Sequence, residues 1–201
     1  MIRILLASSI FRNIPIARRS CYKQKFNDGE IDVFFQRFRP FIEDNATANY
    51  AWQMRNNIKI VRESGYNYLM YVGDDIILPD NAVQVLYDSD KDVISGIHRL
   101  FKHRAGDDHI NAKIIDHTGK QDSDDRYITM DDVSRLPAVF QVHQADFGCM
   151  LFSRKFCMND GLNFDGEPNM INSIFYAGFK PYINTDVRCG HFHFGYKLLN
   201  V

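Results

Sequence analysis

YLMYVGDDIILPD, residues 68–80, joins a short apolar run to two adjacent carboxylates. The apolar residues 68–72 are typical of a buried strand, and Asp74 and Asp75 follow its carboxyl end. Open α/β sheets bind ligands at that edge, and a buried charge without a partner is costly. A divalent cation such as Mn²⁺ or Mg²⁺ would remove this cost and would bridge to a phosphate. Taken alone, the same residues also fit a strand that runs into an acidic turn.

The length and charge of the chain narrow its class. Its 201 residues, of which 45% are hydrophobic, are expected to form one domain with a sizeable core. The 24 basic and 25 acidic residues give a net charge of −1, which argues against nucleic acid as a main partner. No apolar run reaches the roughly 18 residues of a transmembrane segment, and residues 1–6 lack the layout of a signal peptide. We therefore expect a cytoplasmic location.

The cysteines do not indicate a metal-binding framework. They form no C-x-x-C pair, which argues against a zinc ribbon. In a reducing cytosol we expect all of them to be free and buried, whereas a hyperthermophilic source would allow a disulfide. The four residues are Cys21, Cys149, Cys157 and Cys189.

A strand–helix–strand order surrounds the acidic pair and predicts a mostly parallel central sheet flanked by helices. The helix is expected over residues 46–64, because apolar residues recur there at helical spacing and Gly65 ends the run. A short helix over residues 81–87 is expected to be capped by Asp80. The other predicted strands cover residues 2–7, 31–35, 92–97, 145–152 and 181–187, and a further helix ends at Gly178.

Several segments, in the order of the chain, resemble the GT-A fold glycosyltransferases, especially the inverting family related to cellulose and chitin synthases. YLMYVGDDIILPD resembles the D-x-D segment of that family, and ADFGCMLFSR resembles the strand under the acceptor sugar. FDGEPNMINSIFYAGFKPYINTDVRCGH resembles its acidic helix start, glycine-terminated helix, final strand and terminal histidine. The likeness covers about residues 1–193 and is similar to compact members encoded by archaeal viruses and phages.

This resemblance implies a single GT-A, Rossmann-like α/β domain over residues 1–201. Residues 1–100 would form the nucleotide-sugar-binding half and residues 101–193 the acceptor-binding half, with residues 194–201 as a tail. The implied activity is metal-dependent transfer of a sugar from a nucleotide-diphosphate donor to a protein, glycan or lipid acceptor. Oligomerisation with further copies of the chain is left open.

The resemblance also implies the metal ligands. Asp75 matches the usual ligand, Asp74 matches the middle position of D-x-D, and His191 matches the terminal histidine. Gly73 stands where the family has its first acidic residue. The ion, Mn²⁺ or Mg²⁺, would neutralise the diphosphate as the bond to the sugar breaks.

An inverting transfer needs a base that takes a proton from the acceptor hydroxyl. Placed by its spacing to Gly178, Glu167 matches the acidic residue at the family's helix start, where the helix dipole favours an ionised carboxylate. Asp165 becomes the base if the register shifts, and Asp146 begins the strand of the acceptor pocket. A retaining transfer would require no such base.

Two short segments are expected to bind the donor nucleotide. Ala7, Ser8 and Ser9 close the first strand, where a base or ribose would lie. Arg55 and Asn56 stand where the family often has an Arg-Asn pair near the nucleotide, although Arg55 also fits an exposed helix position.

Two other functions are weighed against the glycosyltransferase. A nucleotidyltransferase shares the α/β sheet and the acidic metal site, but it would place a glycine-rich phosphate loop after the first strand. The sequence there is ASSIFR, residues 7–12, without glycine. A non-catalytic, sugar-binding module of the same fold would tolerate Gly73 and would bind without a requirement for Mn²⁺.

Overall fold

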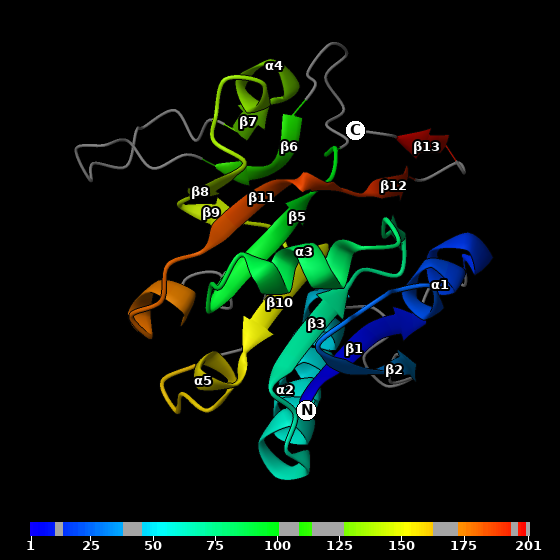
Figure 1. Ribbon diagram of the computed structural model, residues 1–201, viewed down its shortest axis with the longest axis vertical. Coiled ribbons are helices and arrows are strands. Elements are labelled where there is room, and N and C mark those ends of the chain that lie inside the picture. Colours follow the sequence, from blue (N-terminus) through cyan, green and yellow to red (C-terminus); the bar gives the residue numbers. More distant parts are fainter. Residues whose placement is uncertain are drawn as a thin grey trace.

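A seven-stranded, mostly parallel sheet forms the centre of this mixed α/β protein (Figure 1). The computed structural model describes residues 1–10, 14–37, 46–100, 109–113, 127–162, 173–193 and 197–199, with the backbone alone for 46–48, 193 and 197–199. The strands of this sheet are β1 (Ile2–Ile10), β2 (Gly29–Arg37), β3 (Tyr68–Val72), β5 (Val93–Ile97), β8 (Val139–Gln141), β10 (Cys149–Ser153) and β11 (Tyr182–Arg188).

The strand order is β2-β1-β3-β10-β5-β11-β8. Strands β2, β1, β3, β5 and β11 run in one direction, whereas β10 and β8 run against their neighbours. Because β10 is inserted antiparallel between β3 and β5, its amino end lies beside the carboxyl ends of both. Three chain segments therefore meet at this edge: the one after β3, the one after β5 and the one before β10.

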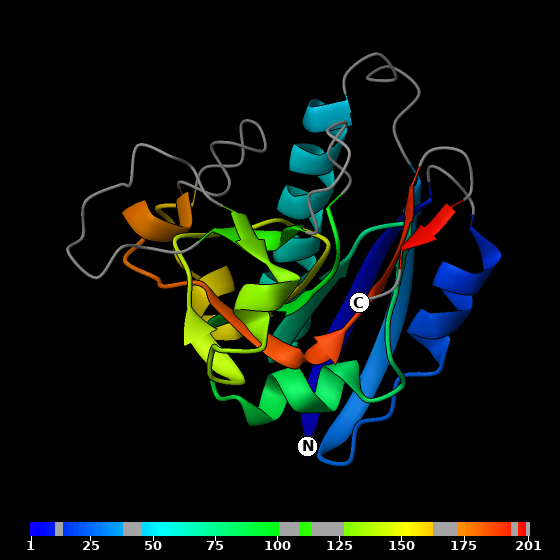
Figure 2. The same cartoon turned by 90° about the horizontal axis from the view of Figure 1, so that it is seen from above.

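Helices cover both faces of the sheet, because alternate residues of each strand point to opposite sides. Leu5 and Ala7 of β1 pack with α2 (Ala46–Ser64), whereas Ile4 and Leu6 pack with α1 (Pro15–Tyr22) and α3 (Ala82–Asp88). Figure 2 shows α2 on one side of the sheet and α1 and α3 on the other. None of the described helices is long and apolar enough to pass through a membrane.

Two smaller sheets adjoin the central one. The first has the order β13-β12-β4, formed by Lys197–Leu199, Gly190–His193 and Ile76–Ile77. The second has the order β7-β6-β9, formed by Tyr127–Thr129, His109–Lys113 and Gln144–Ala145. Two short helices are α4 (Met130–Val133) and α5 (Arg154–Cys157), and residues 173–176, before Gly178, are helical as well. In the first small sheet β12 pairs with β4, directly after the acidic turn, and β13 belongs to the segment expected to be a tail.

The predicted helix over residues 46–64 and the strand over residues 68–72 are confirmed as α2 and β3. The first strand is longer than predicted: β1 continues through Ser8 and Ser9 to Ile10, because β2 pairs with it over that whole length. The predicted cap of α3 is wrong, since Asn81 is the N-cap and makes no side-chain hydrogen bond there.

All four cysteines are free and buried, as predicted. Burial raises the pKa of the Cys21 and Cys157 thiols to about 12, so neither forms a thiolate at neutral pH.

Gly96 of β5 lies against β11 with no room for a side chain. A Cβ atom at this position would lie 2.6 Å from Val187 Cγ1 and 2.8 Å from the Val187 carbonyl oxygen. We predict that Gly96→Ala lowers the free energy of unfolding by about 1–3 kcal/mol, since the added methyl overpacks the sheet. Urea denaturation measures this change. Gly161→Ala, whose Cβ would meet only the Asn159 side chain, serves as the control; equal effects of the two substitutions would refute the prediction.

Candidate functional site

A pocket opens where the three segments meet at the carboxyl edge of β3 and β5. Its volume is about 160 Å³. Among the described residues, two aspartates and two histidines line it, together with aromatic side chains from α2, β3 and the turn before β10. They are Asp75, His98, Asp146 and His191, and the aromatic residues are Tyr50, Tyr71 and Phe147.

The acidic turn is held against β10 by its first residue. The Gly73 amide donates a hydrogen bond of 2.8 Å to the Gly148 carbonyl, and the Ile76 amide donates one of 3.2 Å to the Gly73 carbonyl. A Cβ atom at Gly73 would lie 3.1 Å from both Asp75 Oδ1 and Ile76 Cγ1. An aspartate at this position would therefore crowd Asp75, which gives a steric reason for glycine at the first position of the D-x-D segment.

Asp75 and His191 face each other across the pocket. His191 Nε2 lies 3.2 Å from Asp75 Oδ2, and the Phe192 amide donates a hydrogen bond of 2.8 Å to the Asp75 carbonyl. On its other side the His191 ring lies with Nδ1 2.7 Å from the Arg99 carbonyl oxygen. A carbonyl only accepts hydrogen bonds, so Nδ1 carries the proton in the neutral ring. The Nε2 lone pair then points toward the Asp75 carboxylate.

Two acceptors at this distance repel each other unless a positive charge separates them. Either His191 takes a second proton and becomes an imidazolium, or a cation binds between Nε2 and the carboxylate. A carbonyl that fixes the histidine tautomer through Nδ1 is the usual support of a metal-binding imidazole. An imidazole nitrogen and a carboxylate oxygen are also atom types that bind divalent cations such as Mn²⁺. The described part of the chain contains no group of three or more His, Cys, Asp or Glu side chains placed to hold a metal.

Asp146 approaches the pocket from the side of β10. It does not begin a strand as predicted, because the expected strand over residues 145–152 is broken into β9 and β10, and Asp146 lies in the turn between them. The Asp146 amide donates a hydrogen bond of 2.9 Å to the Asn111 carbonyl. Gln144 Nε2 lies 3.3 Å from Asp146 Oδ1 and acts as a donor to this carboxylate.

His98 was not predicted as a site residue. It directly follows β5, so the same rule that selected the residues after β3 would have found it. Its side chain is almost fully enclosed, and its ring lies edge to face with that of His191 at a centroid distance of 5.1 Å. Burial, together with the neighbouring His191 ring, lowers the pKa of His98 to about 3. The ring is therefore neutral at physiological pH.

A group of enclosed polar side chains lies between α2 and the ends of β1 and β2. Ser9 and Gln36 are paired across these two strands, and Gln53 and Asn57 lie one turn apart on α2. All four residues are at least 94% buried, and one oxygen of each has no hydrogen-bond partner among the described residues. Such oxygens cost about 1–3 kcal/mol each unless water or a ligand reaches them.

The pocket brings together three of the predicted site residues, namely Asp75, Asp146 and His191. The other described ones do not line it: Asp74 is buried in the turn, Ala7, Ser8 and Ser9 are buried within β1, Arg55 is exposed and Asn56 is partly buried on α2. The two remaining base candidates, Glu167 and Asp165, lie outside the described residues.

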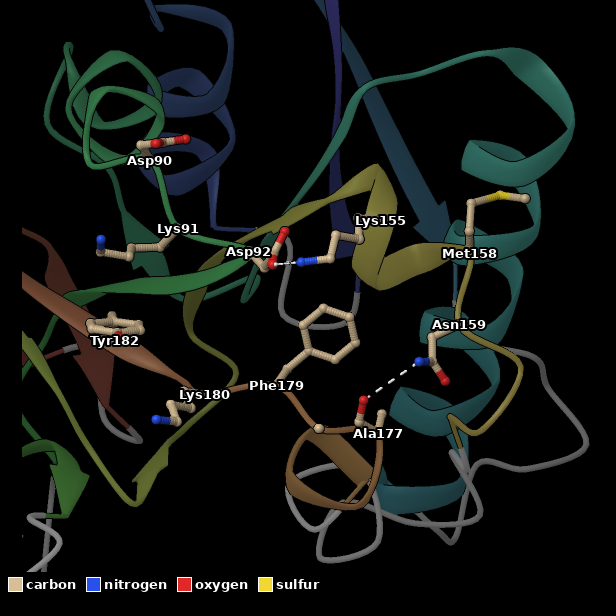
Figure 3. A pocket seen from close by; sticks show the side chains of 11 residues that line it. Asp90, Lys91, Asp92, Lys155, Met158, Asn159, Ala177, Phe179, Lys180 and Tyr182 are labelled. Carbon is tan, nitrogen blue, oxygen red and sulfur yellow. Dashed lines mark hydrogen bonds and ion pairs between the residues drawn. The ribbon is translucent and has the colours of Figure 1, made fainter.

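A larger cavity of about 740 Å³ lies at the opposite edge of the sheet, beside the amino ends of β5 and β11 (Figure 3). Lys155 Nζ lies 2.7 Å from one Asp92 carboxylate oxygen, and Ser153 Oγ donates a hydrogen bond of 2.6 Å to the other. Both carboxylate oxygens are thus satisfied within the protein. None of the predicted site residues that the structure describes lines this cavity, and the pocket at the carboxyl edge is the better candidate site.

The fold and the pocket define a mixed α/β protein with a polar site at the carboxyl edge of its central sheet. No family model matches the sequence, and no curated protein matches it. Among solved structures, the chain is similar to A197 from STIV, with a TM-score of 0.60 over 99% of this chain and 94% of that chain. The two sequences are 13% identical, so this likeness shows a shared fold.

The neutral state of His98 predicts an acid-sensitive stability. In the unfolded chain a histidine titrates near pH 6.5, whereas His98 in the folded protein stays unprotonated down to about pH 3. Below pH 6.5 the unfolded state therefore binds one more proton, and stability falls as the pH falls. Between pH 7 and pH 5 this single group should lower the free energy of unfolding by about 2 kcal/mol.

Urea unfolding at pH 7 and pH 5 tests this dependence. Between pH 7 and pH 5, the free energy of unfolding of His98→Gln should fall by about 2 kcal/mol less than that of the wild type. This difference does not depend on how stable the variant is at pH 7. His143→Gln, which removes a histidine that does not line the pocket, should retain it. The same pH dependence in wild type and His98→Gln would show that His98 is protonated in the folded state.

Proposed function

We propose that this protein is a metal-dependent glycosyltransferase of the GT-A fold, which transfers a sugar from a nucleotide-diphosphate donor to a protein, glycan or lipid acceptor with inversion. The observation that carries the proposal is the pair Asp75 and His191, whose acceptor atoms face each other in a pocket at the carboxyl edge of the sheet. The order of the sequence segments that resemble this family, and an α/β fold with ligand-binding geometry at that edge, support it.

Asp75 Oδ2 and His191 Nε2 would hold the ion, and the oxygens of the donor diphosphate and water would complete its coordination. When bound, the ion supplies positive charge to the diphosphate as it leaves the sugar. An imidazole ligand favours Mn²⁺ over Mg²⁺, which prefers an all-oxygen environment. The Arg99 carbonyl keeps the Nε2 lone pair directed into the pocket.

The donor nucleoside would lie toward the amino-terminal half of α2, where the enclosed oxygens of Ser9, Gln36, Gln53 and Asn57 gather. These groups are neutral hydrogen-bonding groups, which suits a base or ribose and not a phosphate. Tyr50 and Tyr71 lie at the pocket wall on the same side.

The acceptor would approach from the side of Asp146, which lines the pocket from the turn before β10. The Asp146 carboxylate would take a proton from an acceptor hydroxyl there. Glu167 and Asp165 remain candidates for the same role through the family resemblance.

The metal assignment predicts the effect of Asp75→Asn. The substitution removes the charge that faces His191, so Mn²⁺-dependent binding of the nucleotide sugar should be lost while the fold is retained. The measurement is thermal melting with UDP-, GDP-, CMP- and dTDP-sugars, each with and without Mn²⁺, since a ligand of the folded state raises the melting temperature. Asp80→Asn, in the exposed part of the same loop, should keep the wild-type response. A donor shift that survives in Asp75→Asn, or that needs no Mn²⁺ in the wild type, would contradict the assignment.

The identity of the base is tested by amide substitutions that preserve shape. Glu167→Gln, Asp165→Asn and Asp146→Asn are compared for donor binding and for transfer to the acceptor. The variant that removes the base should bind the donor as the wild type does and lose transfer by about 10²–10⁴-fold, the usual contribution of general base catalysis. Full transfer in all three variants would mean that none of these carboxylates is the base.

A further inference from the structure

We infer that His98 is a positioning residue of the metal pocket: its ring sets the orientation of His191, and Asn111 and Gly148 hold it in place. This inference rests on the proposed metal site and adds residues that neither the acidic turn nor the family resemblance indicates.

The rings of His98 and His191 are in direct contact. Their planes meet at 82°, with the centroids 5.1 Å apart, in the edge-to-face arrangement that aromatic rings prefer. His98 is 3% exposed, so its ring forms a wall behind His191 and not a free surface group. The wall and the Arg99 carbonyl together define the direction of the His191 Nε2 lone pair.

The His98 ring packs directly against Gly148, in space that a side chain at that position would fill. A Cβ atom at Gly148 would lie 2.2 Å from His98 Cε1 and 2.8 Å from each ring nitrogen. Any residue other than glycine would therefore push the ring away, and its neighbour on the other side is His191. The Gly148 carbonyl also accepts the hydrogen bond from the Gly73 amide, so the residue that contacts the His98 ring is linked directly to the acidic turn.

Asn111 fixes the main chain of His98 from both directions. Its Oδ1 accepts a hydrogen bond of 2.9 Å from the His98 amide, and its own amide donates one of 3.1 Å to the His98 carbonyl. Its Nδ2 donates to the Gly96 carbonyl at 3.1 Å, and its carbonyl accepts from the Asp146 amide. One fully buried asparagine thus places both the ring behind the metal ligand and the carboxylate across the pocket.

The test compares Mn²⁺ binding in the full chain, measured from the electron paramagnetic resonance signal of free Mn²⁺, for wild type, His98→Asn, Gly148→Ala and the double variant. Loss of outer partners of a ligand typically weakens metal binding by about 10–100-fold, and we expect this of both single variants. The double variant should bind no more weakly than His98→Asn, because the added methyl acts through the ring. Gly161→Ala is the control for an added methyl group. Asp75→Asn, which removes a proposed ligand, shows how far Mn²⁺ binding falls when the site itself is lost.

A second readout needs no metal. In long-range ¹H–¹⁵N spectra, His191 of the wild type should carry a proton on Nδ1, which the Arg99 carbonyl accepts, and His98→Asn and Gly148→Ala should lower the population that carries it. Circular dichroism and melting in metal-free buffer confirm that each variant is folded, and Gly148→Ala carries the test if His98→Asn is not.

The outcomes distinguish a failure of the proposed metal site from a failure of the positioning role of His98. Wild-type protein that binds no Mn²⁺ would overturn the metal site itself. If Asp75→Asn abolishes binding but both single variants bind as the wild type does and keep the His191 tautomer, the site stands and the positioning role of His98 is refuted. Losses that add in the double variant would also refute it, since the methyl would then act by another route.

Discussion

The insertion of β10 between β3 and β5 is the constraint on which the rest of the structure depends. A sheet of parallel strands alone would present a single row of carboxyl ends, each followed by its own loop. The antiparallel strand brings its amino end into that row, and the 2.8 Å hydrogen bond between the Gly73 amide and the Gly148 carbonyl closes the gap. The acidic turn, His98 and Asp146 are neighbours because of this one reversal of direction.

Much of the framework follows from local signals. The run from Tyr68 to Val72 is apolar and uninterrupted, and the helix over residues 46–64 repeats its apolar residues at the helical period, so both elements occur where the sequence places them. The extension of β1 through Ser8 and Ser9 has no local signal, because polar residues enter that strand only through pairing with β2. The break at Asp146 likewise depends on β6, which pairs with β9 and turns the chain before β10 begins.

The residues of the candidate site also fall into those that the sequence predicted and those that it did not. Asp75 and His191 were found because each stands at the end of a recognisable segment. His98 was missed although its place directly after β5 is a sequence signal. Asn111 was missed because its role arises from contacts between β5 and β6 that no spacing in the sequence records. The enclosed oxygens of Ser9, Gln36, Gln53 and Asn57 near α2 cost stability unless water or a ligand reaches them. Polar groups kept in such arrangements are typical of sites that are completed by a ligand.

The pairing of β12 with β4 has a consequence for how the protein is made. Asp75 and His191 are separated by 116 residues, and the strand that carries the histidine lies near the carboxyl end of the chain. On the ribosome, β3 and its acidic turn leave the exit tunnel long before β12 is synthesised. Strands β10 and β11 also follow later in the sequence, so the nascent chain carries an incomplete sheet when the acidic turn emerges. Any shortening of the chain before residue 190 would leave the sheet without the strand that brings the histidine to the pocket.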